Sequence, residues 1–186
     1  MAHILAFAKR LRRRFAGSPS HPSRTYGLLE YAAKILSKQG FTVDIISARD
    51  IPAEDLVVGR YDSPALEKPK GLLEKADGVI IATPIYKAAY TGVLKALAGK
   101  VILPLATGGT IAHLLSIEYA LKPVLSELGA RHILSTIYTV DKQIQIQPDG
   151  SIQLDAEVEQ KLQDVVLDLV KAINISPVTK EVAHAG

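Results

Sequence analysis

The sequence predicts an α/β protein built on a doubly wound parallel sheet, and three observations support this fold class. Short apolar runs rich in β-branched residues alternate with longer segments of helical periodicity. Two of the runs, 78–83 and 101–106, are apolar enough to be buried on both faces of a sheet. The chain of 186 residues has the length of one domain and can bury a substantial core.

The expected elements alternate between strand and helix along the chain. Strands are expected at 3–7, 42–46, 78–83, 101–106 and 132–140, and helices at 24–39, 65–76, 112–128 and 157–173. The first helix has an apolar face at helical spacing, and Gly40 ends it. Pro104 is unexpected inside a central strand, and Pro123 interrupts the third helix. Five strands with intervening helices favour the flavodoxin-like strand order, in a three-layer sandwich.

Composition excludes several classes of protein. The chain has no cysteine, which excludes disulfides, thiol nucleophiles and cysteine-ligated metals and favours a cytoplasmic location. No apolar run approaches the roughly 20 residues that cross a bilayer. A net charge of +3 is too small to indicate nucleic-acid binding. We expect a single domain over 1–175 and a mobile tail over 176–186.

Positive charge is concentrated at the start of the chain. Residues 1–29 carry six lysine and arginine residues, and no acidic residue occurs before Glu30. Such a segment can be a transit peptide or a nucleic-acid-binding arm. The preceding apolar run is very short and a glycine-serine motif lies inside the segment, so a solvated basic turn is the favoured interpretation.

The segment 16–25 places a glycine turn, several hydroxyl groups and an arginine at the start of the first helix. Its candidate ligand-binding side chains are Ser18, Ser20, Ser23, Arg24 and Thr25. Backbone N–H groups and the positive end of the helix dipole converge at a helix N-terminus, so the segment can hold a dianion such as phosphate. An ordinary loop with an N-cap residue has the same composition and stays an alternative for this segment alone.

Two further loops follow the buried strands. In the first, 83–92, a proline turn presents Ile85 and Tyr86, which suits packing against a planar ligand; an ordinary turn with surface tyrosines is the alternative. The second, 107–110, contains paired glycines that let the backbone approach a flat ligand. Ligands bind outside the carboxyl ends of the strands in such sheets, so the coincidence of the loops there favours a ligand site.

Four segments together resemble the NADPH-dependent FMN reductase family, and within it the reductases of alkanesulfonate systems. They are the GSPS and SRT of 17–25, the DSPAL of 62–66, the TPIYKAAYTG of 83–92 and the LPLATGGTIAHLLSIEYALKPVL of 103–125. The resemblance runs from about residue 16 to the last strand, and the last two motifs are specific to the family.

The resemblance implies FMN as cofactor and NADPH or NADH as hydride donor. The FMN phosphate would lie on Ser18, Ser20, Ser23 and Thr25, and the ring against Pro84, Ile85, Tyr86 and Lys87, with Thr107, Gly108 and Gly109 at its other edge. Hydride transfer is the chemistry of the cofactors, which agrees with a sequence in which no metal motif, carboxylate pair or Ser-His-Asp arrangement stands out.

The resemblance also implies partners. The reduced flavin would pass to a two-component sulfonate monooxygenase. Tyr119 matches a tyrosine in a π-bulged helix at a tetramer interface, so a homo-oligomer, either a dimer or a tetramer, is implied. No nucleic-acid or membrane partner is expected.

The chain departs from the family pattern twice. Residues 8–15 form an apparent basic insertion between the first strand and the phosphate-binding segment. The crossover helix near 95–100 is about ten residues shorter than in the family, whereas such crossovers usually need a dozen residues or more. Three alternatives to an active flavin reductase therefore stay open: a non-catalytic FMN-binding electron carrier, an impaired reductase variant, and a quinone or azo-compound reductase.

Overall fold

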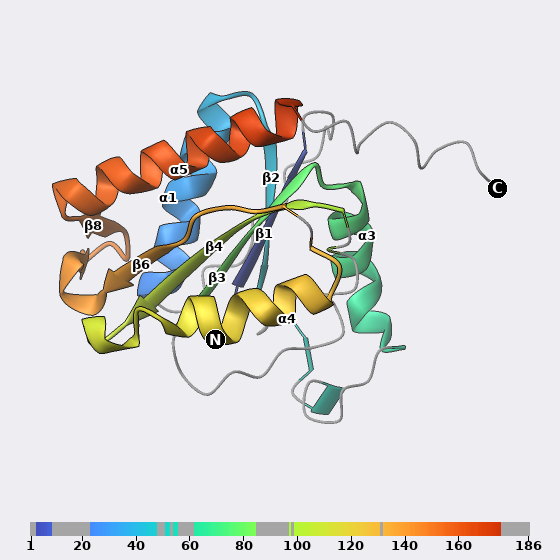
Figure 1. The fold of residues 1–186 in the computed structure, drawn as a ribbon, viewed down its shortest axis with the longest axis horizontal. Coiled ribbons are helices and arrows are strands. Elements are labelled where there is room, and N and C mark those ends of the chain that lie inside the picture. Colours follow the sequence, from blue (N-terminus) through green and yellow to red (C-terminus); the bar gives the residue numbers. More distant parts are fainter. Residues whose placement is uncertain are drawn as a thin grey trace.

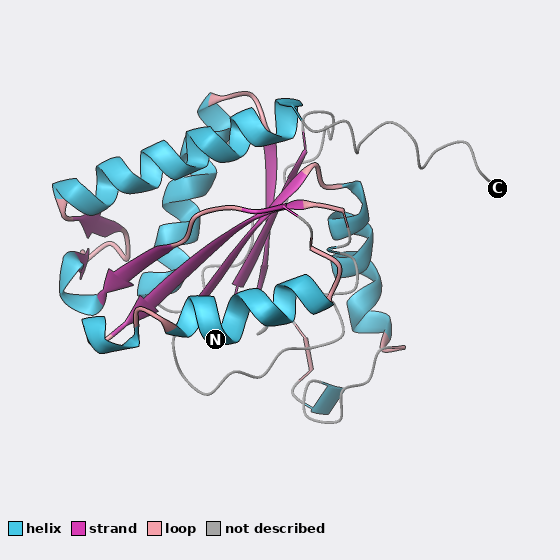
Figure 2. Ribbon diagram, viewed as in Figure 1, coloured by secondary structure: helices cyan, strands magenta, loops and turns pink. Residues whose placement is uncertain are grey.

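A mixed sheet lies between two layers of helices in the computed structural model of the chain (Figure 1). The structure describes residues 3–8, 23–47, 51–52, 54–55, 62–84, 97, 99–130 and 132–175. The strands of the sheet are β1 (His3–Ala8), β2 (Thr42–Ser47), β3 (Gly78–Pro84), β4 (Val101–Gly108), β5 (His132–Ile133) and β6 (Ile137–Val140). Helices α1 (Arg24–Lys38) and α5 (Ala156–Ile175) cover one face, and α3 (Glu67–Lys75) and α4 (Lys122–Glu127) cover the other (Figure 2). The predicted three-layer α/β architecture is confirmed.

The two long helices form where the sequence supplies caps and apolar faces. Ser23 is the N-cap of α1, and its side chain accepts from the Tyr26 amide. Gly40 follows the helix at a φ of 84°, a conformation that favours glycine. The buried residues of α5 recur every three or four positions, at Val158, Leu162, Val166, Leu169 and Ile173. The described part of the chain contains no helix long and apolar enough to span a membrane.

The strand order is β2-β1-β3-β4-β5, as expected for a flavodoxin-like sheet, and β6 also pairs with β4. The direction of β1 differs from the prediction. Strands β3 and β4 are parallel, but β1 runs antiparallel to both of its neighbours, with Ile4 opposite Ile46 of β2 and Ile81 of β3. The predicted all-parallel, five-stranded sheet is therefore wrong, and the sheet is mixed and six-stranded.

The reversal of β1 follows from where its end and the start of α1 lie. Ala8 ends β1 opposite Thr42, the first residue of β2, so β1 finishes at the amino edge of the sheet. Helix α1 begins at the carboxyl edge, where Thr25 hydrogen-bonds to Thr107 near the end of β4. A strand that ran directly into α1 would have to be parallel, but the long connection, 9–22, allows the opposite direction. Those connecting residues lie outside the described part of the chain.

Pro104 lies in the central strand β4, beside a gap in the ladder. The predicted strand 132–140 is in fact two strands, β5 and β6, separated by residues 134–136. The Ile102 carbonyl accepts from the Leu134 amide. Backbone groups of a parallel strand alternate sides, so the nitrogen of Pro104 faces the same gap. A residue without an N–H is tolerated there because the gap requires no hydrogen bond from it.

The predicted helix over 112–128 is a series of shorter segments. A 3-10 turn, η4 (Ile111–His113), and a π-helix, η5 (Ile117–Leu121), precede α4. Pro123 is in the first turn of α4, where a missing N–H is tolerated. The π-bulge that the resemblance implies around Tyr119 is confirmed. The remaining short elements are η2 (Pro64–Leu66), η6 (Asp141–Gln143) and the hairpin strands β7 (Ile144–Ile146) and β8 (Ile152–Leu154).

Candidate functional site

The three predicted loops converge at the carboxyl edge of β3 and β4. Pro84, the last residue of β3, is the register partner of Thr107 in β4. The Thr107 hydroxyl oxygen lies 2.7 Å from that of Thr25, in the first turn of α1. The structure therefore brings together one residue from each loop. Ser18, Ser20, Ile85, Tyr86 and Lys87 lie outside the described residues.

The N-terminus of α1 is suited to an anion. The first backbone N–H groups of a helix have no intrahelical acceptor, and the first turn of α1 contains no acidic residue. Ser23, the N-cap, lies 3.4 Å from the Tyr26 amide through its hydroxyl oxygen. The dipole of this 15-residue helix adds positive potential at the same end. A phosphate group fits these donors.

A hydrogen bond between two buried threonines joins this end of α1 to β4. Thr25 and Thr107 are each 3% exposed, and either hydroxyl can be the donor of the bond between them. When Thr107 donates, the proton of the Thr25 hydroxyl stays available to a ligand. Thr139, the register partner of Thr107 in β6, is fully buried, and its hydroxyl has no hydrogen-bond partner among the described residues. The contact between α1 and β4 is thus polar at its edge.

The hairpin β7–β8 holds the side chain of Arg24. The Arg24 Nε group donates to the Ile144 carbonyl at 3.1 Å, a bond that uses one of the five N–H donors of the guanidinium. The hairpin also packs on the first turns of α1, because a Cβ on Gly27 would lie 2.4 Å from Cγ2 of Ile152. Ile144 and Ile152 are absent from the predicted site, and no motif in the sequence marks them.

The turn after β4 lies against Tyr138 of β6. The Tyr138 hydroxyl donates to the Thr110 carbonyl at 2.6 Å, and a Cβ on Gly108 would lie 2.1 Å from the same hydroxyl oxygen. Burial, and then the charge of Asp141, raise the pKa of Tyr138, which keeps its hydroxyl protonated at neutral pH. Tyr138 is also absent from the predicted site. Its place near the carboxyl end of a strand beside β4 is the signal that could have found it.

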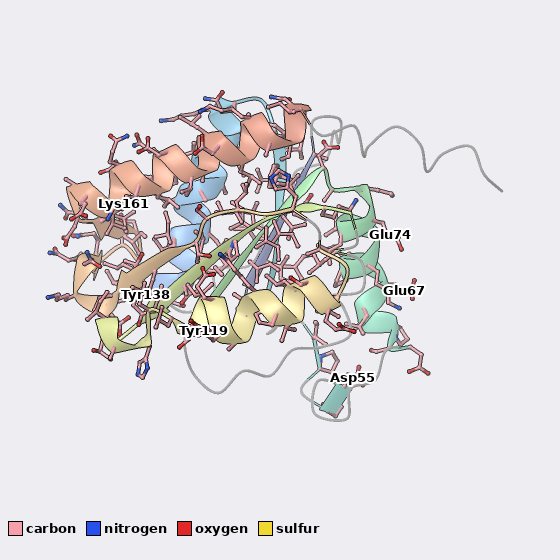
Figure 3. The ribbon with its side chains drawn as sticks, viewed as in Figure 1. Asp55, Glu67, Glu74, Tyr119, Tyr138 and Lys161 are labelled. Atoms are coloured by element: carbon pink, nitrogen blue, oxygen red, sulfur yellow. The ribbon has the colours of Figure 1, made fainter. Side chains whose placement is uncertain are left out.

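An exposed apolar surface adjoins this turn. Its side chains are Ile111, Leu114, Leu115 and Tyr119, which are 63%, 45%, 57% and 79% exposed. Figure 3 shows Tyr119 and Tyr138 toward the same end of the molecule. A cluster of large exposed apolar side chains marks an interaction surface.

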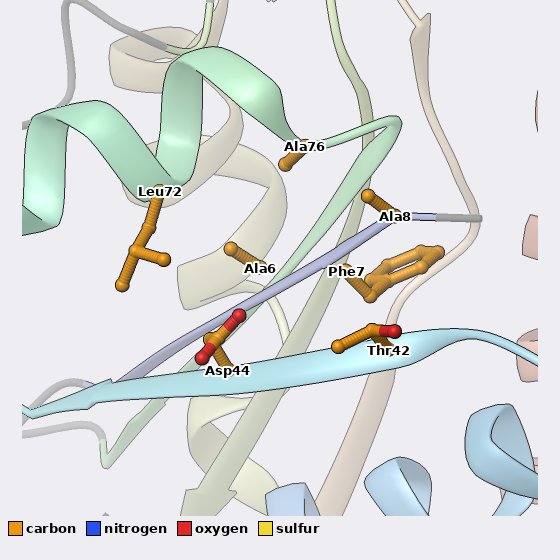
Figure 4. Close-up of a pocket in the computed structure, with 7 residues that line it drawn as sticks. All are labelled: Ala6, Phe7, Ala8, Thr42, Asp44, Leu72 and Ala76. Atoms are coloured by element: carbon orange, nitrogen blue, oxygen red, sulfur yellow. The ribbon is translucent and has the colours of Figure 1, made fainter. Parts of the chain in front are cut away.

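One buried carboxyl group lies on the amino side of the sheet. Asp44 of β2 is 6% exposed and lines a small cavity between β1, β2 and the end of α3 (Figure 4). Burial raises the pKa of Asp44, although the charge of Lys68 opposes this shift, and its Oδ1 atom has no partner among the described residues. The other lining residues are Ala6, Phe7, Ala8, Thr42, Leu72 and Ala76. This nearly apolar setting makes Asp44 a destabilising buried acid, and it offers no second set of ligand-binding groups.

The carboxyl-edge site is built for binding and orientation. Its described groups are hydroxyls, one arginine and the backbone of a helix end and a glycine turn. Among the described residues, no three His, Cys, Asp or Glu side chains are placed to hold a metal ion. Such a site can hold a phosphate-bearing planar ligand, and the bond-making chemistry then belongs to the bound cofactors.

The strand order is that of flavodoxin-like proteins, and the carboxyl edge of the central strands, where the N-terminus of α1 lies, is the edge at which such sheets bind ligands. The family model described as NADPH-dependent FMN reductase matches residues 14–145. The chain belongs to this family and is an oxidoreductase that works with NAD(P)H and FMN.

Curated relatives are similar over most of their length. The FMN reductase (NADPH) of Escherichia coli (strain K12) is 47% identical over 160 residues, which cover 77% of this chain and 84% of the relative. The FMN reductase (NADPH) of Pseudomonas putida is 44% identical, with 80% of each chain covered. The NADH-dependent FMN reductase SfnE of Pseudomonas putida is 33% identical over 62% of this chain and 68% of the relative.

One solved structure supports the same assignment, and a second supports the fold. The apo form of an NADH:FMN oxidoreductase (EMOB) has a TM-score of 0.67 at 36% identity, with 91% of this chain and 93% of that chain covered. FerB from Paracoccus denitrificans, with a TM-score of 0.61 at 20% identity over 85% of this chain and 93% of that one, shows the fold alone. The family match begins at residue 14, so β1 lies outside it, which agrees with the unusual direction of this strand.

Proposed function

We propose that the carboxyl edge of β3 and β4 is the site at which this enzyme transfers a hydride from NAD(P)H to FMN. The observation that carries the proposal is the buried bond between Thr25 and Thr107, by which the N-terminus of α1 lies beside the end of β4. Bound FMN supplies the electron-accepting ring, so the protein binds and orients the cofactors and needs no acid or base of its own.

The FMN phosphate binds at the N-terminus of α1 in this proposal. Its partners are Ser18, Ser20, Ser23, Arg24 and Thr25. Support comes from the N-cap position of Ser23 and from a first turn that lacks acidic residues. The bond of Arg24 to Ile144 uses one N–H group and leaves further N–H donors of the guanidinium for an anion.

The ring of FMN lies between the other two loops. Its partners on one side are Pro84, Ile85, Tyr86 and Lys87, and on the other Thr107, Gly108 and Gly109. The pairing of Pro84 with Thr107 supports this placement, because it sets the starts of the two loops side by side at one edge of the sheet. The glycine turn lets its backbone approach the ring closely and exclude water from that side.

We also propose the fate of the reduced flavin. The motif at 103–125 resembles that of alkanesulfonate-system reductases, so the reduced flavin is delivered to a two-component sulfonate monooxygenase. A reductase with this role has to release its flavin. Transfer to a purified monooxygenase of this type, measured as sulfonate-dependent NAD(P)H oxidation, tests the partnership.

Self-association through the exposed apolar surface completes the proposal. Support comes from four large apolar side chains that are exposed in one stretch of the chain, Ile111, Leu114, Leu115 and Tyr119. The chain is then a dimer or a tetramer. Sedimentation of the wild-type chain and of Tyr119→Ala checks this directly, because a smaller assembly is expected for the variant.

The reductase proposal is tested by titrating the purified chain with FMN and following flavin fluorescence. NADPH is then added and its near-ultraviolet absorbance is followed. Binding with steady, FMN-dependent oxidation supports the proposal. Binding without turnover indicates an electron carrier, and absence of binding shows that the two departures from the family pattern have disabled the site.

The phosphate assignment has its own test. Only FMN carries the phosphate, so the double variant Ser18→Ala/Ser23→Ala is expected to weaken FMN roughly tenfold or more relative to riboflavin, because bonds to a charged group are lost. Riboflavin is the matched control, since it has the same ring. An equal loss for both ligands contradicts the placement of the phosphate.

A further inference from the structure

Gly108 ends β4 and Gly109 begins the turn after it, and the surroundings of the two glycines differ. A Cβ on Gly108 would lie 2.1 Å from the Tyr138 hydroxyl oxygen and 3.0 Å from Cζ of the same ring, so the protein itself leaves no room for a side chain. A Cβ on Gly109 would meet no described atom within 4 Å beyond its chain neighbours. Neither glycine is among those with positive φ. Packing therefore explains Gly108, whereas neither backbone conformation nor packing against the described residues explains Gly109.

Tyr138 is placed to fix this turn. It is the register partner of Ala106 in β6, and its ring packs against the core on the α3 and α4 face of the sheet. Its hydroxyl donates to the Thr110 carbonyl at 2.6 Å. Thr110 is in turn the N-cap of η4, with its side chain accepting from the Ala112 amide. One hydroxyl thus holds the point at which the turn enters the next helical segment.

We propose that Tyr138 is a positioning residue for the flavin. By its hydrogen bond to Thr110 and its contact with Gly108, it holds the turn so that the open side of Gly109 faces the bound ring. This inference rests on the proposed function, because it assumes that FMN binds at this edge of the sheet. It adds the residue that sets the geometry of the turn, and it separates a structural glycine from a ligand-facing one.

The variant Tyr138→Phe tests the role of the hydroxyl. It keeps the ring in the core and removes the bond to Thr110, and we expect the dissociation constants of FMN and riboflavin to rise together, by roughly three- to tenfold. An equal effect on both ligands is the signature of a contact with the ring. Binding is measured well below the unfolding temperature of each variant, so that a loss of stability alone does not change it.

Tyr31→Phe is the matched control. The Tyr31 hydroxyl donates to the Glu159 carboxylate and joins α1 to α5, so this variant also loses the bond of a tyrosine hydroxyl, but away from the turn. We expect this variant to be less stable and to bind FMN within about twofold of the wild type. If Tyr138→Phe also binds both flavins as the wild type does, the positioning role is overturned.

The glycine pair supplies the second measurement. Gly109→Ala is expected to weaken both flavins and to leave the unfolding temperature unchanged. Gly108→Ala is expected to lower the unfolding temperature, and Tyr138→Phe in the same chain to restore part of the loss, because it removes the nearest clashing atom. Wild-type affinity in Gly109→Ala would overturn the inference.

The two levels of proposal fail in distinguishable ways. A wild-type chain that binds neither flavin removes the proposed function. A wild-type chain that binds FMN, with unchanged binding in Tyr138→Phe and Gly109→Ala, leaves that function standing and removes the role of Tyr138.

Discussion

The hydroxyl groups of Thr25 and Thr107 lie 2.7 Å apart in the buried interface between α1 and β4, although the residues are 82 positions apart in the chain. This bond is the direct link between the predicted phosphate-binding loop and the predicted glycine turn. Each threonine alone is an ordinary residue at the end of a helix or strand. Together they show that the N-terminus of α1 and the end of β4 meet at one edge of the sheet.

Thr107→Val is expected to destabilise the fold. The substitution keeps the shape of the side chain and leaves the buried hydroxyl of Thr25 without its partner, which costs about 1–3 kcal/mol. Thr25→Val/Thr107→Val removes both polar groups, so its loss should be smaller than the sum of the two single losses. Urea denaturation of the wild type, Thr25→Val, Thr107→Val and the double variant measures this coupling. Strictly additive losses would show that the bond contributes nothing.

Asp44→Val is expected to stabilise the fold at neutral pH. Burial raises the pKa of Asp44 above its value in the unfolded chain, with the charge of Lys68 opposing part of the shift. Between the two pKa values the native state holds more protons than the unfolded state, so the free energy of unfolding falls as the pH rises through this window. Removing a buried carboxylate whose Oδ1 atom has no hydrogen-bond partner among the described residues should therefore add about 1–2 kcal/mol at pH 7.

The pH dependence of the free energy of unfolding identifies the cause of the stabilisation by Asp44→Val. The advantage of Asp44→Val should shrink toward acid pH, near the ordinary aspartate pKa of about 3.9. Asp44→Asn keeps the shape of the side chain and cannot titrate, so it should lose the same pH dependence. A difference between wild type and Asp44→Asn that is constant from acid to neutral pH would contradict the buried charge as its source.

Lys100 stabilises the end of α3. Its ammonium group donates to the carbonyls of Glu74 at 2.9 Å and Ala76 at 2.8 Å, at the helix end where carbonyls lack intrahelical partners. Lys100→Met keeps the apolar stem and should cost about 1–3 kcal/mol in thermal or urea unfolding. Lys75→Met is the control, because Lys75 is exposed in the last turn of the same helix. Equal losses in both variants would exclude a capping role.

The alternation of apolar runs was sufficient to predict the layers and the strand order, and the three loops predict the edge at which we place the site. These features depend on local composition and on general rules of α/β sheets. The contact of Tyr138 with Gly108 was beyond prediction, because it depends on the register of β6 against β4. The gap beside Pro104 was beyond prediction for a similar reason, because a sequence does not show where the hydrogen bonds between two strands are interrupted.

The direction of β1 was the largest error, and the length of the connection explains it. An apolar run such as 3–8 has no intrinsic direction. Residues 9–22 can extend over roughly 45 Å, whereas a six-residue strand spans about 20 Å, so the connection can return from the amino edge to the start of α1. Without residues 8–15 the remaining segment can span the length of the strand but is too short to pass over a helical layer in addition. We therefore expect deletion of 8–15 to turn β1 parallel to β2.

Engineered cysteine pairs measure this direction, and the absence of native cysteine makes them unambiguous. Ile4 and Ile46 are register partners in the antiparallel arrangement, at a spacing that a disulfide can bridge. Ile4→Cys/Ile46→Cys should cross-link in the full chain, and Ile4→Cys/Thr42→Cys should not. In the deletion variant we expect the reverse: Ile4→Cys/Thr42→Cys should cross-link and Ile4→Cys/Ile46→Cys should not, because the start of a parallel β1 lies beside the start of β2. A deletion variant that keeps the first cross-link would show that the length of the connection does not set the direction of the strand.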